Sequence, residues 1–253
     1  MTVPNKVIPI ITEGETDGCI VDAFEEAFYG ERLSFTGVAS GGDITLYKIH
    51  PENFRGLSGA GITGKVRTLI KQEIERRHEF RERDVIAVAL LMDLDGAFIP
   101  DSRIFEGIEL KYCADSIETN RVKEIRLRNR EKKARVSELV DNCSELKIGS
   151  KMVPFRAFYM SRNLEHALWD IADNLTGNAG KNRKRELSLA FIEKCESDPN
   201  YFKDLITSDA VLHGCSEYRN SWLWAFEGLH SLQRGSNVGL LPVELGFTWP
   251  DER

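Results

Sequence analysis

The chain has 253 residues, of which 42% are hydrophobic and 29% charged, and its formal net charge is -6. Such a composition supplies a large apolar core for a globular protein, and the negative charge disfavours a protein that coats nucleic acid without sequence preference. The apolar runs are too short to cross a bilayer and the start of the chain lacks a signal-type apolar segment, so we expect a cytoplasmic protein with no membrane partner.

The first part of the chain alternates between predicted strands and helices. Hydrophobic periodicity predicts a strand over residues 6–12, a helix over 18–29, a second strand over 33–39 and a third over 85–92. The stretch 41–64 is rich in glycine and predicts a loop, with a helix from Lys65 onward. The unbroken apolar run 85–92 is typical of a strand at the centre of a parallel sheet that helices cover on both faces.

The second part predicts a long charged helix over 117–140, within a basic helical insertion of about residues 115–147. A further strand is expected over 153–160, followed by a helix, and from about residue 174 the chain is predicted to be helical. The predicted fold class is therefore α/β, a parallel sheet flanked by helices. Residues 1–173 would form the main domain, and residues 174–253 a helical region packed on it.

Acidic residues follow three of the predicted strands. Glu13 and Asp17 come after the first, Asp93 and Asp95 after the 85–92 strand, and Glu165 after the 153–160 strand. Sites in open α/β sheets form outside the carboxyl ends of the strands, where these acids would converge. Clustered carboxylates repel one another and are costly to bury, so we expect Mg²⁺ there, with Mn²⁺ able to substitute. Two such ions about 4 Å apart can promote phosphodiester cleavage. Taken singly, Asp17 or Asn163 could instead begin a helix as its cap.

The acidic pattern resembles a known family. An apolar strand that ends in Glu-Gly-x-Thr-Asp (residues 13–17) and a later strand that ends in Asp-x-Asp (residues 93–95) are similar to the Toprim domain. The spacing of Glu13 and Asp17, and the sequence Asn163-Leu164-Glu165, look most like the catalytic domain of the overcoming-lysogenization-defect (OLD) nucleases. This resemblance covers roughly residues 6–170. One departure is Met92, where the family often has a hydroxyl side chain.

The resemblance implies a Toprim-like sheet that binds Mg²⁺ and cleaves DNA or RNA, including transfer RNA. It implies that Glu13, Asp17 and Asp93 share one ion, and that Asp95 and Glu165 hold a second. It also implies a site lysine, for which Lys181 and Lys184 are the candidates. Chains of this kind often act as toxic effectors in bacterial anti-phage defence under a separately encoded ATPase, and a homo-oligomer is possible. A non-catalytic Toprim binding module is the alternative, although the full acidic set favours catalysis.

Basic residues are concentrated in two segments, one between Arg121 and Arg135 and a shorter one at 181–185. Each can be a solvated helix face with charge pairs along the helix, or a surface for the phosphate backbone. For contact with nucleic acid we predict five residues: Lys65, Arg67, Arg126, Arg130 and Lys133.

Two rival motifs use the same part of the chain. Residues 92–98 resemble the nucleophile loop of haloacid-dehalogenase-like phosphatases, in which Asp93 would attack phosphorus and Asp95 would be the general acid. That interpretation needs a later acidic pair, for which only Asp170 and Asp173 are available, and it leaves Glu13 and Asp17 without a role.

Residues 59–65 match most of the phosphate-loop pattern but continue with Val66 instead of Ser or Thr. A flexible loop beside the site is a better interpretation than a phosphate loop, and an ordinary turn that leads into a helix is the simplest.

The aromatic segment 221–232 has helical spacing and predicts a packing helix, with a partner interface as the alternative.

Overall fold

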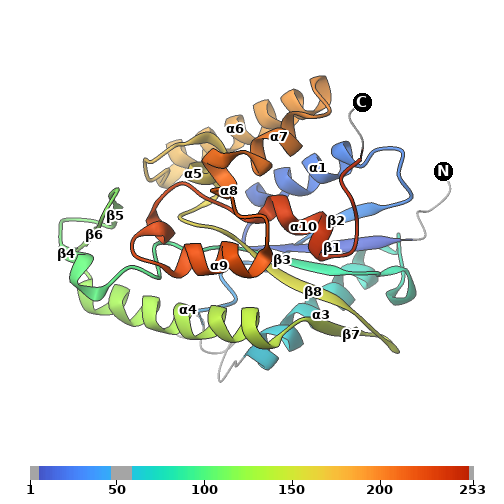
Figure 1. Ribbon diagram of the computed structural model, residues 1–253, viewed down its shortest axis with the longest axis horizontal. Coiled ribbons are helices and arrows are strands. Elements are labelled where there is room, and N and C mark those ends of the chain that lie inside the picture. The colour runs from blue at the N-terminus through green and yellow to red at the C-terminus, as the bar shows by residue number, and fades with distance from the viewer. Residues whose placement is uncertain (1–5, 47–58, 251–253) are drawn as a thin grey trace.

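Five strands form the central sheet of the computed structural model, which describes residues 6–46 and 59–250 (Figure 1). In sheet order they are β2 (Ser34–Ala39), β1 (Val7–Thr12), β3 (Val88–Asp93), β8 (Lys151–Met160) and β7 (Glu145–Ile148). The first four run parallel, and β7 pairs antiparallel with β8 at the edge. The chain passes from β1 to β2 on one side and then to β3 on the other. The strand order therefore reverses between β1 and β3, which is where open α/β sheets bind ligands.

Helices cover both faces of this sheet, which confirms the predicted α/β class (Figure 1). One face packs against α1 (Gly18–Ala27), α5 (Leu164–Trp169), α6 (Gly177–Ser197), α7 (Tyr201–Thr207) and α10 (Leu241–Glu244). The other packs against α3 (Gly59–Arg77), α4 (Val122–Asn142) and α9 (Tyr218–Phe226). Both faces of the sheet are apolar, because side chains alternate along each strand. On β3, Leu90 and Met92 point into the α3 and α4 layer, while Ala89 and Leu91 point into the α1 layer.

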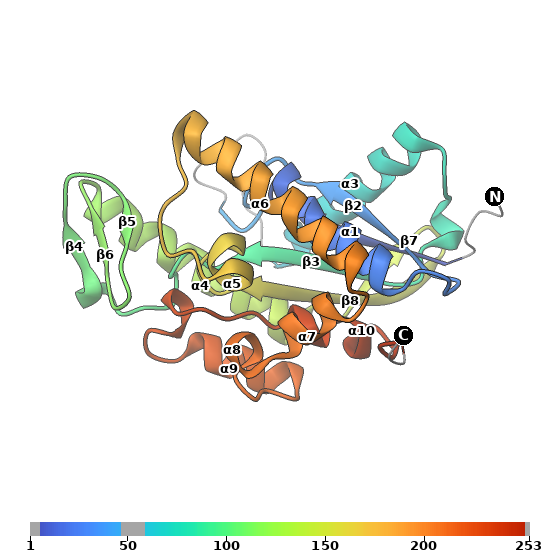
Figure 2. The same ribbon diagram turned by 90° about the horizontal axis from the view of Figure 1, so that it is seen from above.

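A second, three-stranded sheet lies at one end of the molecule (Figure 2). Its strands are β4 (Ile104–Glu106), β6 (Ile117–Thr119) and β5 (Lys111–Tyr112), in that order. Its small core includes Ile104, Ile117 and Ile125, so it packs on the start of α4. The remaining short elements are α8 (Asp209–Leu212) and 3-10 turns at Glu15–Asp17, Glu82–Asp84, Asp101–Arg103, His230–Leu232 and Val238–Leu240.

The glycine-rich segment is where the sequence prediction was wrong. Helix α3 begins at Gly59 rather than at Lys65, so Gly61 and Gly64 lie in a helix and not in a flexible loop. Each glycine disfavours a helix by about 1 kcal/mol, but Ile62 and Val66 are fully buried one helical turn apart, and their packing outweighs that cost. A phosphate loop is equally incompatible with this helix. In the rest of the predicted loop, residues 41–46 form no helix or strand, as expected, and residues 47–58 lie outside the described residues.

The predicted basic helix exists, but it begins later than expected. Residues 117–119 form β6 and residues 145–148 form β7, so only Val122–Asn142 of the 115–147 segment is helical. The helix is not simply solvated, because Val136 and Leu139 are buried in the core against the sheet. One face of α4 therefore packs in the protein interior.

The helical character of the C-terminal region is confirmed, since no strand occurs between residues 174 and 250. Its side chains enter the core on both faces of the sheet, Phe202 on one and Trp222 on the other. The burial of Trp222 confirms that residues 221–232 contain a packing helix. No helix in the described ranges has the length and apolar character needed to cross a membrane.

Candidate active site

The carboxyl ends of β1, β3 and β8 meet at one edge of the sheet. The backbone N–H of Asp93 donates to Oε1 of Glu13 at 3.1 Å, which joins the end of β3 to the residue after β1. The N–H of Asp95 donates to the carbonyl of Arg162 at 3.0 Å, which joins the same loop to the residues after β8. Since Glu165 lies in the first turn of α5 just beyond Arg162, the three predicted sets of acids share this edge.

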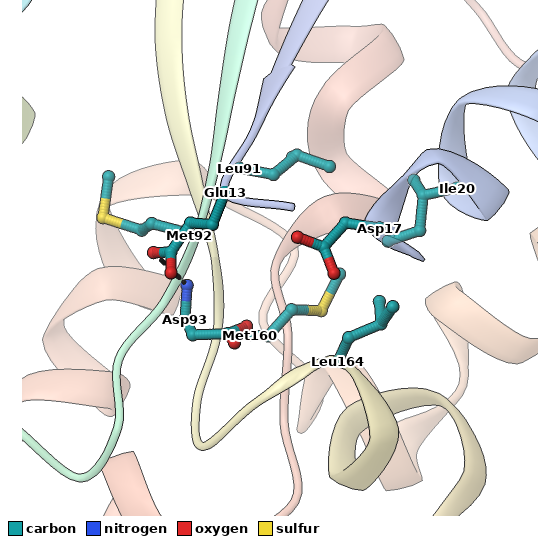
Figure 3. A pocket seen from close by; sticks show the side chains of 8 residues that line it. All are labelled: Glu13, Asp17, Ile20, Leu91, Met92, Asp93, Met160 and Leu164. Carbon is teal, nitrogen blue, oxygen red and sulfur yellow. Dashed lines mark hydrogen bonds between the residues drawn. The ribbon is translucent and has the colours of Figure 1, made fainter. Parts of the chain in front are cut away.

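Three of the acids line one small pocket, Glu13, Asp17 and Asp93 (Figure 3). The carboxyl groups of Asp17 and Asp93 point toward the space between them, and Glu13 lies beside Asp93. Asp17 is also tied to its own loop, because its Oδ2 accepts a hydrogen bond from the N–H of Gly14 at 2.9 Å. The remaining walls are apolar and come from Ile20, Leu91, Met92, Met160 and Leu164. The pocket therefore holds carboxylates in surroundings that solvate them poorly.

The electrostatics of these three acids follow from that environment. Burial, and then the charge of Asp43, raises the pKa of Glu13 well above its ordinary value. Burial, followed by the charges of Asp17 and Asp95, does the same to the pKa of Asp93. The pKa of Asp17 is raised by burial and by Glu165. Across residues 6–46 and 59–250, no lysine or arginine forms an ion pair with any of the three.

Asp95, in contrast, is bound to a fully buried lysine. The Nζ of Lys132 on α4 lies 2.9 Å from Oδ2 of Asp95 and 2.7 Å from Oδ2 of Asp43. The second oxygen of Asp43 accepts hydrogen bonds from the N–H and the hydroxyl of Thr45. Burial lowers the pKa of Lys132, but the charges of Asp43 and Asp95 outweigh this and raise the pKa well above its ordinary value. The ammonium therefore stays charged inside the protein.

Further donors hold the loop that carries Asp95. The hydroxyl of Tyr112 on β5 donates to Oδ1 of Asp95 at 3.3 Å, and Arg128 donates to the Asp95 carbonyl at 2.8 Å. Asp95 itself has a left-handed backbone with φ of 52°. Burial raises the pKa of Asp95, but Lys132 and Arg128 lower it to below its ordinary value. Asp95 is thus held as a carboxylate in a fixed position.

Glu165 also has a lysine partner. The Nζ of Lys184 on α6 lies 2.8 Å from Oε1 of Glu165, which is only 3% exposed. Of the two candidate site lysines, Lys184 is the one placed at the acids, whereas Lys181 is exposed on α6. Asn163 caps α5, because its Oδ1 accepts from the N–H of His166 at 2.9 Å. The cap interpretation therefore holds for Asn163.

The residues predicted to contact nucleic acid lie on two helices. Lys65 and Arg67 are on α3, where Arg67 is exposed. On α4, Arg126 donates to the carbonyl of Ile104, Arg130 pairs with Asp101 at 2.5 Å, and Lys133 lies 3.5 Å from the carbonyl of Phe98. These three cations contact residues 98–104 of the chain itself, and the Asp101 carboxylate offsets the charge of Arg130.

The donor chemistry fits a hard divalent cation, because the charged side chains that line the pocket are all carboxylates. The arrangement is not a finished cage. Within the described ranges, no three acidic, histidine or cysteine side chains are placed so that they could hold a metal ion together. Glu13, Asp17 and Asp93 would therefore need side-chain rotations to share an ion in the pocket.

Sequence reasoning missed Asp43, Tyr112, Arg128 and Lys132. A signal for Lys132 existed, because Ile125, Val136 and Leu139 mark the buried stripe of α4 and Lys132 occupies the same stripe. A lysine at an apolar position needs a buried partner. Asp43 and Tyr112 carry no comparable signal, since each lies in a short segment without periodicity.

No protein-family model, no curated protein and no solved structure matches this chain. Function must therefore be inferred from the residues of this site.

Proposed function

We propose that this protein is a Mg²⁺-dependent nuclease of the Toprim type that hydrolyses phosphodiester bonds in DNA or RNA. The observation that carries the proposal is the grouping of Glu13, Asp17 and Asp93 around one pocket at the point where the strand order reverses. Of the five predicted site acids, these three have no ion pair in the described part of the chain. A divalent cation is the simplest group that would offset their mutual repulsion.

Each part of the site has a proposed role. Glu13, Asp17 and Asp93 would hold the ion, with Mn²⁺ able to replace Mg²⁺. When bound, the ion supplies Lewis-acid polarisation of the phosphodiester. Lys184, which lies 2.8 Å from Glu165, would be the lysine of the site at the same edge. The apolar walls around Leu91 and Met160 limit the water that reaches the acids, which strengthens their interactions with any cation.

The haloacid-dehalogenase-like phosphatase is less well supported. That mechanism needs Asp95 to donate a proton as general acid. Burial raises the pKa of Asp95, but the charges of Lys132 and Arg128 outweigh this and lower the pKa, which favours the ionised form. The acids available as a later pair, Asp170 and Asp173, are both exposed. A non-catalytic binding module would explain an absence of cleavage, but it gives no reason for three half-buried acids that have no ion pair among the described residues.

The biological role belongs to the same proposal and rests on the Toprim resemblance alone. It is that of a toxic effector in anti-phage defence, active in the cytoplasm and controlled by a separately encoded ATPase.

The test is cleavage by the purified chain. Single-stranded and double-stranded DNA, messenger RNA and transfer RNA are incubated with Mg²⁺ or Mn²⁺, with and without an ATPase encoded beside the gene. We expect cleavage of at least one substrate and a loss of at least about 100-fold in Glu13→Gln, since even groups that only support a metal ligand affect activity by about 10- to 100-fold. Glu106→Gln, which alters an exposed acid on β4, is the matched control.

Two outcomes would contradict the nuclease. One is the absence of cleavage of every substrate under all of these conditions, which would favour the binding module. The other is hydrolysis of p-nitrophenyl phosphate that is lost in Asp93→Asn but retained in Glu13→Gln, which would favour the phosphatase.

A further inference from the structure

Lys132 places a fixed positive charge inside the candidate site. Its side chain is 0% exposed, and its ammonium bridges Asp43 and Asp95 at 2.7 and 2.9 Å. An ammonium that bridges two carboxylates does what a metal ion would otherwise do there, because it offsets their repulsion and fixes their separation.

Hydrogen bonds attach helix α4 to the loop that carries Asp95. Arg128 donates to the carbonyl of Asp95 at 2.8 Å, and Asn129 donates to the carbonyl of Gly96 at 3.4 Å. Together with Lys132, these residues attach one turn of α4 to the loop after β3. The ammonium is thus held by a rigid element and not by a flexible side chain at the surface.

The charges at the sheet edge then separate into two parts. Asp95 is paired with Lys132, and Glu165 is paired with Lys184 at 2.8 Å. Both oxygens of Asp95 already have donors, Lys132 on one and Tyr112 on the other. The other three predicted site acids, Glu13, Asp17 and Asp93, have no ion pair among residues 6–46 and 59–250.

We infer that Lys132 takes the place of a second divalent cation, so that this chain binds one divalent ion at its site and not two. The inference rests on the proposed function, because it concerns the same metal site. It replaces the two-ion expectation with one ion, which Glu13, Asp17 and Asp93 would hold, and one permanent ammonium. Lys132 is then a positioning residue, since it acts on the reaction through Asp95 and not by touching the substrate.

The number of bound ions tests this directly. Mn²⁺ is titrated into the full chain, and the free ion is counted by electron paramagnetic resonance, which requires no substrate and no cleavage. We expect one ion per chain for the wild type. For the double variant Lys132→Met/Asp43→Asn we expect two, because the ammonium is removed while the Asp95 carboxylate and the new amide oxygen at position 43 remain as ligands. The double variant is used because Lys132→Met alone leaves two buried carboxylates unpaired, which threatens folding; circular dichroism verifies that the protein remains folded.

Lys123→Met, which alters an exposed lysine on the same helix, is the matched control and should bind one ion like the wild type. Two ions in the wild type would overturn the inference and leave the nuclease proposal intact. One ion in the folded double variant would overturn it as well, because Lys132 would then not occupy a cation position. No ion in the wild type would overturn both this inference and the metal site of the proposed function.

Discussion

The acids at the carboxyl edge of the sheet form two groups that differ in their partners. Asp95 lies 2.9 Å from the ammonium of Lys132, and Glu165 lies 2.8 Å from that of Lys184. Glu13 and Asp93 lie within the same edge but have no ion pair in the part of the chain that the structure describes. Burial acts on both groups, yet it raises the pKa of Asp93 while the cations beside Asp95 lower its pKa.

This difference shows that burial alone does not decide what a carboxylate contributes. A paired acid such as Asp95 maintains the shape of the site, because its removal would leave a buried ammonium without a counter-charge. An unpaired acid such as Asp93 opposes folding until it is protonated or binds a cation. The two groups should therefore respond in opposite directions when their charge is removed.

The largest effect is expected when the ammonium is removed. Lys132→Met leaves Asp43 and Asp95 buried without their cation, and breaking a buried pair costs about 3–5 kcal/mol of the free energy of unfolding. Urea denaturation in EDTA, followed by circular dichroism, measures this loss. Lys123→Met should change the same free energy by less than about 0.5 kcal/mol. A loss below about 1 kcal/mol in Lys132→Met would mean that water reaches the two carboxylates, because exposed ion pairs contribute no more than this.

A matched pair of substitutions separates the two groups of acids. Asp95→Asn removes a counter-charge of Lys132 and should lower the free energy of unfolding by about 3 kcal/mol. Asp93→Asn removes a half-buried charge that has no ion pair among the described residues, and it should raise the free energy of unfolding by about 1 kcal/mol in EDTA. Adding Mg²⁺ should stabilise the wild type more than Asp93→Asn, because ligand binding stabilises only the folded state that binds it. If both variants lose stability to the same degree, the two groups do not differ.

The sequence was sufficient to predict where the acids lie in the fold, but not which of them form ion pairs. The apolar runs that became β1, β3 and β8 are long, and the acids follow directly, so their convergence on one edge is a consequence of parallel topology. Their partners are far away in the chain, since Lys132 lies 37 residues beyond Asp95. The basic composition of α4 does not show which of its lysines and arginines is buried. That residue is found only from its position in line with the buried apolar residues of the helix.

The start of α3 was missed for a related reason. Local propensity at Gly61 and Gly64 favours a loop, and only the burial of Ile62 and Val66 against the sheet makes the segment helical. Burial of this kind depends on the neighbours in the fold and is not visible in the local pattern. The pairing of Asp43 with Lys132 is likewise tertiary, because residues after β2 and on α4 come together only around the completed sheet.

A small effect is expected for a carboxylate whose cationic partners are exposed to water, which serves as a reference for the pairs with a buried ammonium. Glu73 on α3 accepts hydrogen bonds from Arg76 at 2.6 Å and from Arg77, whose side chains remain partly exposed. Hydrogen bonding from Arg76 lowers the pKa of Glu73 despite its burial. Water screens such a pair, so Glu73→Gln should lower the free energy of unfolding by less than about 1 kcal/mol at pH 7.

The pH dependence fixes the sign of this last prediction. Because the folded pKa of Glu73 is depressed, its contribution is present above the unfolded value of about 4.3 and is lost as the pH falls through the folded pKa. The difference between the wild type and Glu73→Gln, measured by urea denaturation, should therefore shrink as the pH falls below about 4. Glu75→Gln, whose partner Lys71 is 3.9 Å away with both side chains exposed, should show a smaller difference throughout. If Glu73→Gln costs as much as Lys132→Met, pairing alone sets the energy and burial of the ammonium adds nothing to it.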